Sequence, residues 1–169
     1  MAEYQATATD TKVFQLLSEE TVVGMLQYTE WYTFKAAAAL ADGSSFQITP
    51  KGFWGTTIEL KDQDKVLLSF KMNWDGSIII KSRLTADGRA FVVKSKGTFK
   101  QSFVLLDKDG QELVVVKPGY KWNKISPEYQ ISTTDSFEEL AAKHLLLLTT
   151  VHCINYYMTM AVSTILMAS

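Results

Sequence analysis

Short apolar runs separated by turn residues occupy the chain from about residue 12 to residue 133. The runs are rich in Val, Ile, Phe and Tyr, the residue types that favour β-strands. Asp-Gly pairs lie between several of them, and Asp-Gly readily adopts the positive φ angles that tight hairpin turns require. These pairs fall at 42–43, 75–76, 87–88 and 109–110. The pattern predicts about ten antiparallel strands, joined mainly by hairpins.

Two stretches, 103–106 and 113–116, are apolar without interruption. A strand with one face in water should alternate polar and apolar residues. These stretches therefore predict strands with little solvent on either face, or barrel strands that pack on something inside. The run AAAAL at 36–40 is compatible with a strand or with a short helix.

After the last predicted strand the pattern changes to that of a helix. The stretch STTDSFEELAAKHLLLL predicts a helix start with Asp135 or Ser136 as the N-cap. Two glutamates follow in the first turn, where the helix dipole favours anions. We expect the helix over about 136–160. The pattern leaves open whether the helix breaks, and whether it stops near Tyr157 or continues to the end of the chain.

The chain from 145 to 168 contains no Asp, Glu, Lys or Arg, and this admits two interpretations. A bilayer core needs about 20 apolar residues, so the segment is long enough for a membrane anchor. Polar residues at helical spacing form a stripe along it, however: Thr149, His152, Asn155, Tyr156, Thr159 and Ser163. Unpartnered His and Asn are costly in lipid, and a barrel of ten or more strands is too wide for its own side chains to fill. We therefore predict that the helix fills the barrel, with the anchor as the alternative.

Composition narrows the classes of function. Of the 169 residues, 47% are hydrophobic and 21% are charged, which is usual for a globular protein, and the length predicts a single domain over 1–169. The net charge of −1 argues against a nucleic-acid binder, because phosphate binding needs a basic excess.

Cys153 is the only cysteine, so no internal disulfide is possible and a reducing compartment fits. The first twelve residues lack a secretory-signal pattern, and we expect a cytoplasmic protein.

The sequence has no motif for catalysis or metal binding. It contains neither a G-x-S-x-G elbow nor a P-loop. His144 and His152 are eight residues apart but lack a third metal ligand at a useful spacing. We expect His144 at an exposed helix end and His152 as a hydrogen-bonded core residue. The prediction is a protein that is not an enzyme, with no catalytic residue, no metal and no cofactor.

Basic residues form two pairs on adjacent predicted strands. Lys81 and Arg83 alternate on one strand and Lys94 and Lys96 on the next, so each pair shares a face. A four-residue loop over 85–88 would bring both pairs to one face, and a three-residue loop would separate them. The four are candidate lipid-binding residues, and the alternative is a solvated barrel exterior.

A further basic cluster contains aromatic residues. Lys117, Lys121 and Lys124 flank Tyr120 and Trp122, and such a loop could lie at a lipid head-group layer. These three lysines complete the set of candidate lipid-binding residues. Trp54 and Trp74 lie at predicted turns, where we expect them to close an end of the barrel to water rather than to anchor a ligand.

The order of parts, a hairpin-rich β-region followed by one apolar helix, resembles the tubby C-terminal-like superfamily, which includes tubby proteins, phospholipid scramblases and the LURP-one-related proteins. The resemblance covers roughly residues 55–160 and is carried by FVVKSKGTFKQSFVLLDKDGQELVVVKPGYKWNKISPEYQI and HLLLLTTVHCINYY. It implies a closed antiparallel barrel of about twelve strands around a buried C-terminal helix, an intracellular location and, in some members, binding of membrane phosphoinositides. The Pro-rich region and cysteine clusters of scramblases do not occur in this sequence.

Together these features predict a mainly β protein, a closed barrel of about 10–12 strands around a hydrophobic C-terminal helix. The expected function is that of a non-enzymatic, soluble binding or adaptor module. Its expected partner is an anionic phospholipid or a protein, with any membrane contact peripheral. One alternative is a structural or self-assembling component, and another is a tail-anchored membrane protein.

Overall fold

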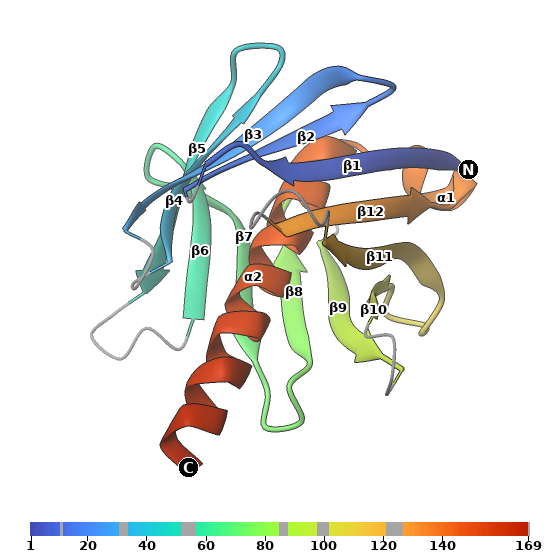
Figure 1. Ribbon diagram of the computed structural model, residues 1–169. Coiled ribbons are helices and arrows are strands. Elements are labelled where there is room, and N and C mark those ends of the chain that lie inside the picture. The colour runs from blue at the N-terminus through green and yellow to red at the C-terminus, as the bar shows by residue number, and fades with distance from the viewer. Residues whose placement is uncertain are drawn as a thin grey trace.

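The computed structural model describes residues 1–10, 12–30, 34–51, 57–84, 88–97, 102–120 and 127–168. These residues form a closed antiparallel β-barrel of twelve strands, with two helices after the last strand (Figure 1). The predicted barrel of about 10–12 strands with a C-terminal helix is thus confirmed. The strands are β1 (Ala2–Ala8), β2 (Val13–Ser18), β3 (Thr21–Glu30), β4 (Lys35–Leu40), β5 (Ser45–Lys51), β6 (Thr57–Asp62), β7 (Lys65–Met72), β8 (Ile78–Ser82), β9 (Arg89–Lys96), β10 (Ser102–Leu106), β11 (Glu112–Tyr120) and β12 (Pro127–Thr133). The helices are α1 (Asp135–Glu138) and α2 (Lys143–Ala168).

The strand that closes the barrel is one that the sequence pattern did not predict. β1 lies before residue 12, where we expected no strand, and it pairs with β2 on one side and β12 on the other. Its inward residues Tyr4, Ala6 and Ala8 are buried. Two of the three are alanines, which weaken the apolar alternation that identifies a strand. Closure therefore depends on a pairing between distant parts of the chain, in which Tyr4 lies opposite Ile131.

The hairpin turns lie where the Asp-Gly pairs predicted them. Gly43, Gly76, Gly88 and Gly110 have φ angles of 93°, 84°, 65° and 82°, which glycine adopts without steric cost. In two of these turns the aspartate, Asp42 or Asp75, accepts hydrogen bonds from the backbone N–H and the hydroxyl of the serine two residues later. These hydrogen bonds lower the pKa of both carboxyls.

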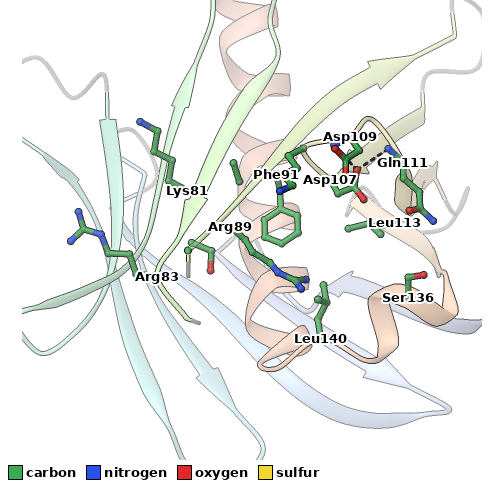
Figure 2. Close-up of a pocket in the computed structure, with 14 residues that line it drawn as sticks. Lys81, Arg83, Arg89, Phe91, Asp107, Asp109, Gln111, Leu113, Ser136 and Leu140 are labelled. Atoms are coloured by element: carbon green, nitrogen blue, oxygen red, sulfur yellow. Dashed lines mark hydrogen bonds between the residues drawn. The ribbon is translucent and has the colours of Figure 1, made fainter. Parts of the chain in front are cut away.

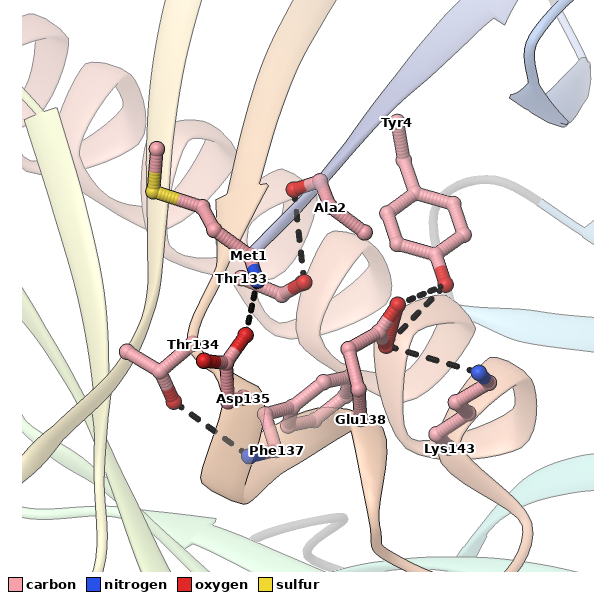
Figure 3. A network of polar contacts seen from close by, with 9 residues as sticks. All are labelled: Met1, Ala2, Tyr4, Thr133, Thr134, Asp135, Phe137, Glu138 and Lys143. Carbon is pink, nitrogen blue, oxygen red and sulfur yellow. Dashed lines mark hydrogen bonds and ion pairs between the residues drawn. The ribbon is translucent and has the colours of Figure 1, made fainter.

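The N-cap of the first helix differs from the prediction. Thr134, rather than Asp135 or Ser136, takes this position, with an extended backbone. Its side-chain oxygen accepts a hydrogen bond from the backbone N–H of Phe137, as Figure 3 shows. Because Ser, Thr and Asp are all good N-caps, the end of β12 decides which of them is used.

The break that the sequence pattern left open is present, and the helical segment forms two helices. α1 is a single turn, and Ala142, with a φ of 55°, redirects the chain into α2. Glu138 of α1 contacts both β1 and α2. Its carboxylate accepts a hydrogen bond from the Tyr4 hydroxyl at 2.8 Å and lies 3.6 Å from Nζ of Lys143 (Figure 3). α2 then continues to Ala168, beyond the expected end near residue 160.

α2 enters the barrel and fills its lumen (Figure 1). Every residue from 145 to 155 is buried, including Leu147, His152 and Ile154 at 0% exposure. The predicted position of the apolar helix inside the barrel is confirmed for this part of the segment. No helix in the described part of the chain is both long enough and apolar enough to span a membrane.

Small residues on the inner face of the barrel make room for α2, which lies against β3 and β4. The alanine run at 36–40 belongs to β4, so the strand alternative holds, and Ala36 and Ala38 are buried on its inner face. At Gly24 of β3, an added Cβ would lie only 2.9 Å from Cδ1 of Leu148. Glycine at this position therefore lets the helix approach the strand closely.

Two residues of the polar stripe, His152 and Asn155, form hydrogen bonds with strand residues inside the barrel, although Nε2 of His152 is buried without a partner among the described residues. Nδ2 of Asn155 donates to the Tyr28 hydroxyl at 3.0 Å, and Oδ1 of Asn155 accepts from the Tyr129 hydroxyl at 2.6 Å. The Tyr28 hydroxyl lies 2.8 Å from Nδ1 of His152. The two groups are hydrogen-bonded, and the tautomer of the neutral His152 ring decides which of them donates. His152 is thus a hydrogen-bonded core residue, as predicted.

Deleting residues 137–169 should prevent the barrel from folding, because an empty lumen would expose the apolar inner faces of the strands. Far-UV circular dichroism and the dispersion of amide NMR signals would measure this loss. Deletion of 161–169 is the matched control, because it starts beyond the residues that we find buried, and it should leave the barrel folded. A folded barrel after the longer deletion would contradict the role of α2 as core.

Stability should decrease on acidification because of His152. Burial lowers the pKa of His152 to about 3, whereas an unfolded histidine titrates near 6.5. The stabilising effect is therefore complete above about pH 6.5 and is lost as the pH falls toward 3. Between about pH 7.5 and pH 5, this group should lower the free energy of unfolding by about 2 kcal/mol, measurable by urea titration. His152→Gln cannot titrate, and its amide can still hydrogen-bond with Tyr28 in either direction, so it should lack this part of the pH dependence. An equal dependence in both proteins would refute the assignment.

Candidate binding surface at one end of the barrel

The register of β8 and β9 brings the four predicted basic residues to one outer face. Lys81 pairs with Ala90, so odd-numbered positions of β8 and even-numbered positions of β9 point the same way. The four-residue loop would have placed Lys81 opposite Val92, and the observed pairing is shifted by two residues. A shift by two preserves the face. The residues on it are Lys81, Arg83, Lys94 and Lys96, and all four are exposed.

The two basic pairs nevertheless lie at different ends of this face. Lys81 and Arg83 border a pocket near α1, and no carboxylate among the described residues lies within ion-pair distance of them. Lys81 lies opposite Ala90 of β9, and Lys94 is four residues farther along that strand. The distance along the strand is about 13 Å. Lys96 is paired with Glu112, with Nζ 3.0 Å from the carboxylate. The four residues therefore do not form a single cationic cluster.

The end of the barrel remote from α1 is where α2 leaves the lumen, and we name it the exit end (Figure 1). It comprises the β7–β8 turn at 73–77, the adjacent strand ends and α2 from Tyr156 onward. A Cβ at Gly76 in this turn would lie 2.9 Å from the ring of Tyr157, so the turn lies directly against the helix. Residues 158–168 continue beyond this contact for about 16 Å, and Figure 1 shows this part of α2 projecting from the barrel.

Trp74 lies in the β7–β8 turn and is fully exposed. The prediction that it closes the end of the barrel is therefore wrong. Tyr157 fills that space instead, with its ring 5.4 Å from that of Phe103. Met160, farther along α2, is another large apolar side chain with 40% of its surface exposed. Trp54 lies outside the described residues.

Two exposed lysines at the exit end have no ion-pair partner among the described residues. Lys51 and Lys71 stand in one row, because both pair with Thr57 of the strand between them. Lys71 also lines a shallow hollow with Trp74. Lys117 is also exposed, but it lies within β11, opposite Gln130 and on the third strand from β8, so it is not part of the exit end. The sequence pattern did not indicate Lys51 and Lys71, because their alignment depends on the pairing of three strands.

The remaining predicted lysines contribute less to this surface. Lys94 lies near Asp75, whose pKa is lowered mainly by hydrogen bonds from Ser77 and to a smaller extent by the charge of Lys94. Lys94 therefore has an acidic neighbour, unlike Lys71. Lys121 and Lys124 lie outside the described residues.

The two other sites that the sequence raised are structural. His144 lies in the first turn of α2, at a helix end as predicted, but it is partly buried, with its ring 5.7 Å from that of Tyr4. Burial lowers the pKa of His144. Burial also raises the pKa of the Cys153 thiol, which lies in the core. Within the described ranges, no three His, Cys, Asp or Glu side chains are grouped so that they could hold a metal ion.

Comparisons with known proteins return no match to this chain, whether with protein-family models, with curated proteins or with solved structures.

Replacing Trp74 by Ala should change the free energy of unfolding by less than about 0.5 kcal/mol, because the side chain is fully exposed. Tyr157→Ala is the comparison, since it removes an aromatic ring that packs on the core, and it should cost at least about 1.5 kcal/mol. Urea unfolding monitored by circular dichroism gives both values. A Trp74→Ala variant as unstable as Tyr157→Ala would restore the closing role for Trp74.

Proposed function

We propose that this protein is a non-enzymatic binding module that docks through its exit end on membranes containing anionic lipid. The observation that carries this proposal is the fully exposed Trp74, which lies beside a projecting apolar helix and among lysines without acidic partners. Anionic lipids are concentrated in the cytoplasmic leaflet, so we place the protein on the cytoplasmic side, bound peripherally.

Each part of the exit end suits a lipid head-group layer. Tryptophan is enriched at membrane–water interfaces, because its indole ring has a large apolar surface and one polar N–H group. An exposed tryptophan side chain can therefore bury apolar surface by entering the head-group layer. Lysines near an anionic surface contribute about 1 kcal/mol each, and Lys51 and Lys71 have no acidic partner among the described residues. The sequence of 158–168 contains no charged residue, so the end of α2 can enter the interface without burying a charge.

The resemblance to the tubby C-terminal-like superfamily adds weight to this proposal, because some members of that superfamily bind membrane phosphoinositides. A protein partner is the competing interpretation. The outer face between the basic pairs carries a partly exposed apolar strip that includes Ile79, Val92 and Leu106, and such a strip would suit a protein partner or a second copy of the chain. The projecting helix end and the exposed Trp74 favour lipid.

Sedimentation with vesicles tests the proposal. Wild-type protein should bind vesicles of phosphatidylcholine and phosphatidylserine at low salt and should bind pure phosphatidylcholine weakly. The double variant Lys51→Glu/Lys71→Glu should bind the anionic vesicles at least about 30-fold more weakly, because two favourable contacts of about 1 kcal/mol each are lost and each glutamate is repelled by the anionic surface. Trp74→Ala should weaken binding to both vesicle types.

The matched control is Lys65→Glu/Lys108→Glu, which makes the same change of charge at the end remote from α2's exit. It should bind as wild type does. Equal weakening by the two double variants would show that only net charge matters and would refute docking through the exit end. If the wild-type protein binds no anionic vesicle but self-associates in light scattering, the structural alternative would replace the lipid proposal.

A further inference from the structure

A pocket opens at the end of the barrel opposite the exit end. It has a volume of about 670 Å³ and lies between the end of β8, the start of β9, the β10–β11 turn and the α1 region (Figure 2). Sites for small ligands commonly have volumes of 300–1,000 Å³. The pocket shares no lining residue with the exit end, so it needs an explanation of its own.

The floor of this pocket is part of the barrel core. Phe91 and Leu113 line it, with 3% and 4% of their surfaces exposed, and both belong to the core cluster. Leu140, in the connection between α1 and α2, adds an apolar wall. The break between α1 and α2 places Leu140 here, since an unbroken helix would have carried this residue elsewhere. The apolar part of a small ligand could therefore pack against the floor and against Leu140 at the same time.

Arg89 supplies the polar feature of the pocket. It pairs with the buried Ser82 and alternates with Phe91 and Val93, so it stands at an inner-face position at the first residue of β9. In Figure 2 its side chain extends between Phe91 and Leu140, away from Lys81 and Arg83. Among the described residues no carboxylate pairs with it and no hydrogen bond engages its guanidinium. Arg89 is exposed, so its guanidinium is hydrated and available to a ligand at the edge of the apolar floor.

The charges around the opening favour an anion. Four basic residues line the pocket, against two carboxylates, Asp107 and Asp109. Oδ1 of Asp107 accepts hydrogen bonds from the backbone N–H groups of Asp109 and Gln111, which hold this carboxylate within its turn, and the basic residues outnumber the carboxylates by two. The basic residues are Lys81, Arg83, Arg89 and Lys108.

We propose that this pocket binds a small organic carboxylate with a compact apolar body, with Arg89 pairing the carboxylate and the apolar body resting on Phe91, Leu113 and Leu140. The planar guanidinium can donate two parallel hydrogen bonds to a carboxylate, which gives both affinity and orientation. Lys81 and Arg83 at the rim attract the anion but do not contact its apolar part. The sequence signal for this site is a charged residue at an inner-face position of a barrel strand.

The test compares two probes that differ only in charge, 2-naphthoate and 2-naphthamide, by isothermal titration calorimetry. Wild-type protein should bind the naphthoate at least about tenfold more tightly than the amide. Arg89→Gln should remove this preference and leave the affinity for naphthamide unchanged. Leu140→Ala should weaken both probes equally. The control Lys65→Gln removes a cation at the same end that does not line the pocket, and it should keep the full preference.

Several results would overturn the proposal: equal affinity of the two probes for wild type, a preserved preference in Arg89→Gln, or no binding of naphthoate up to about 5 mM. Arg89 is exposed, so Arg89→Gln should fold normally, which circular dichroism checks. The same variant should sediment with anionic vesicles as wild type does. Failure of this site and failure of membrane docking are therefore distinguishable.

Discussion

The structure depends on the packing of α2 inside a barrel that cannot fill itself. Twelve strands enclose a lumen too wide for their own side chains, and the apolar residues of α2 from Leu145 to Ile154 occupy it. Small residues at Gly24, Ala36 and Ala38 shape the inner wall to the helix. The closure of the barrel by β1 and β12 and the burial of the helix are mutually dependent, because an open sheet would expose both.

A purely apolar helix would not be held in one orientation inside such a barrel. The hydrogen bonds among Asn155, Tyr28, Tyr129 and His152 fix both the rotation of α2 and its depth in the barrel. A rotated or shifted helix would leave these buried groups unpaired, which would destabilise the folded protein. The depth of the helix in turn determines how much of it remains outside. Tyr157 closes the end of the barrel, and the later residues project beyond it. The core network thereby sets the geometry of the exit end.

The two ends of the barrel present different chemistry. The exit end combines an exposed indole, an apolar helix end and unpaired lysines, which suits an extended anionic interface. The opposite end combines a bounded pocket with Arg89 and an apolar floor, which suits a single small anion. A barrel docked by its exit end would leave the pocket facing water. The two proposed sites are thus compatible with each other, and neither requires the other.

The sequence by itself determined the features that arise from neighbouring residues. Asp-Gly pairs predicted the turns, apolar runs predicted the strands, and the stripe of polar residues distinguished a core helix from a uniformly apolar segment. Tertiary structure decided what depends on partners distant in the chain. β1 is a strand because β2 and β12 lie on either side of it, and Thr134 is the N-cap because β12 ends there. The exposure of Trp74, the row of Lys51 and Lys71 and the inward position of Arg89 follow from strand register and from the course of α2. Register and helix depth are set by the packing of the whole barrel, and no local stretch of sequence contains that information.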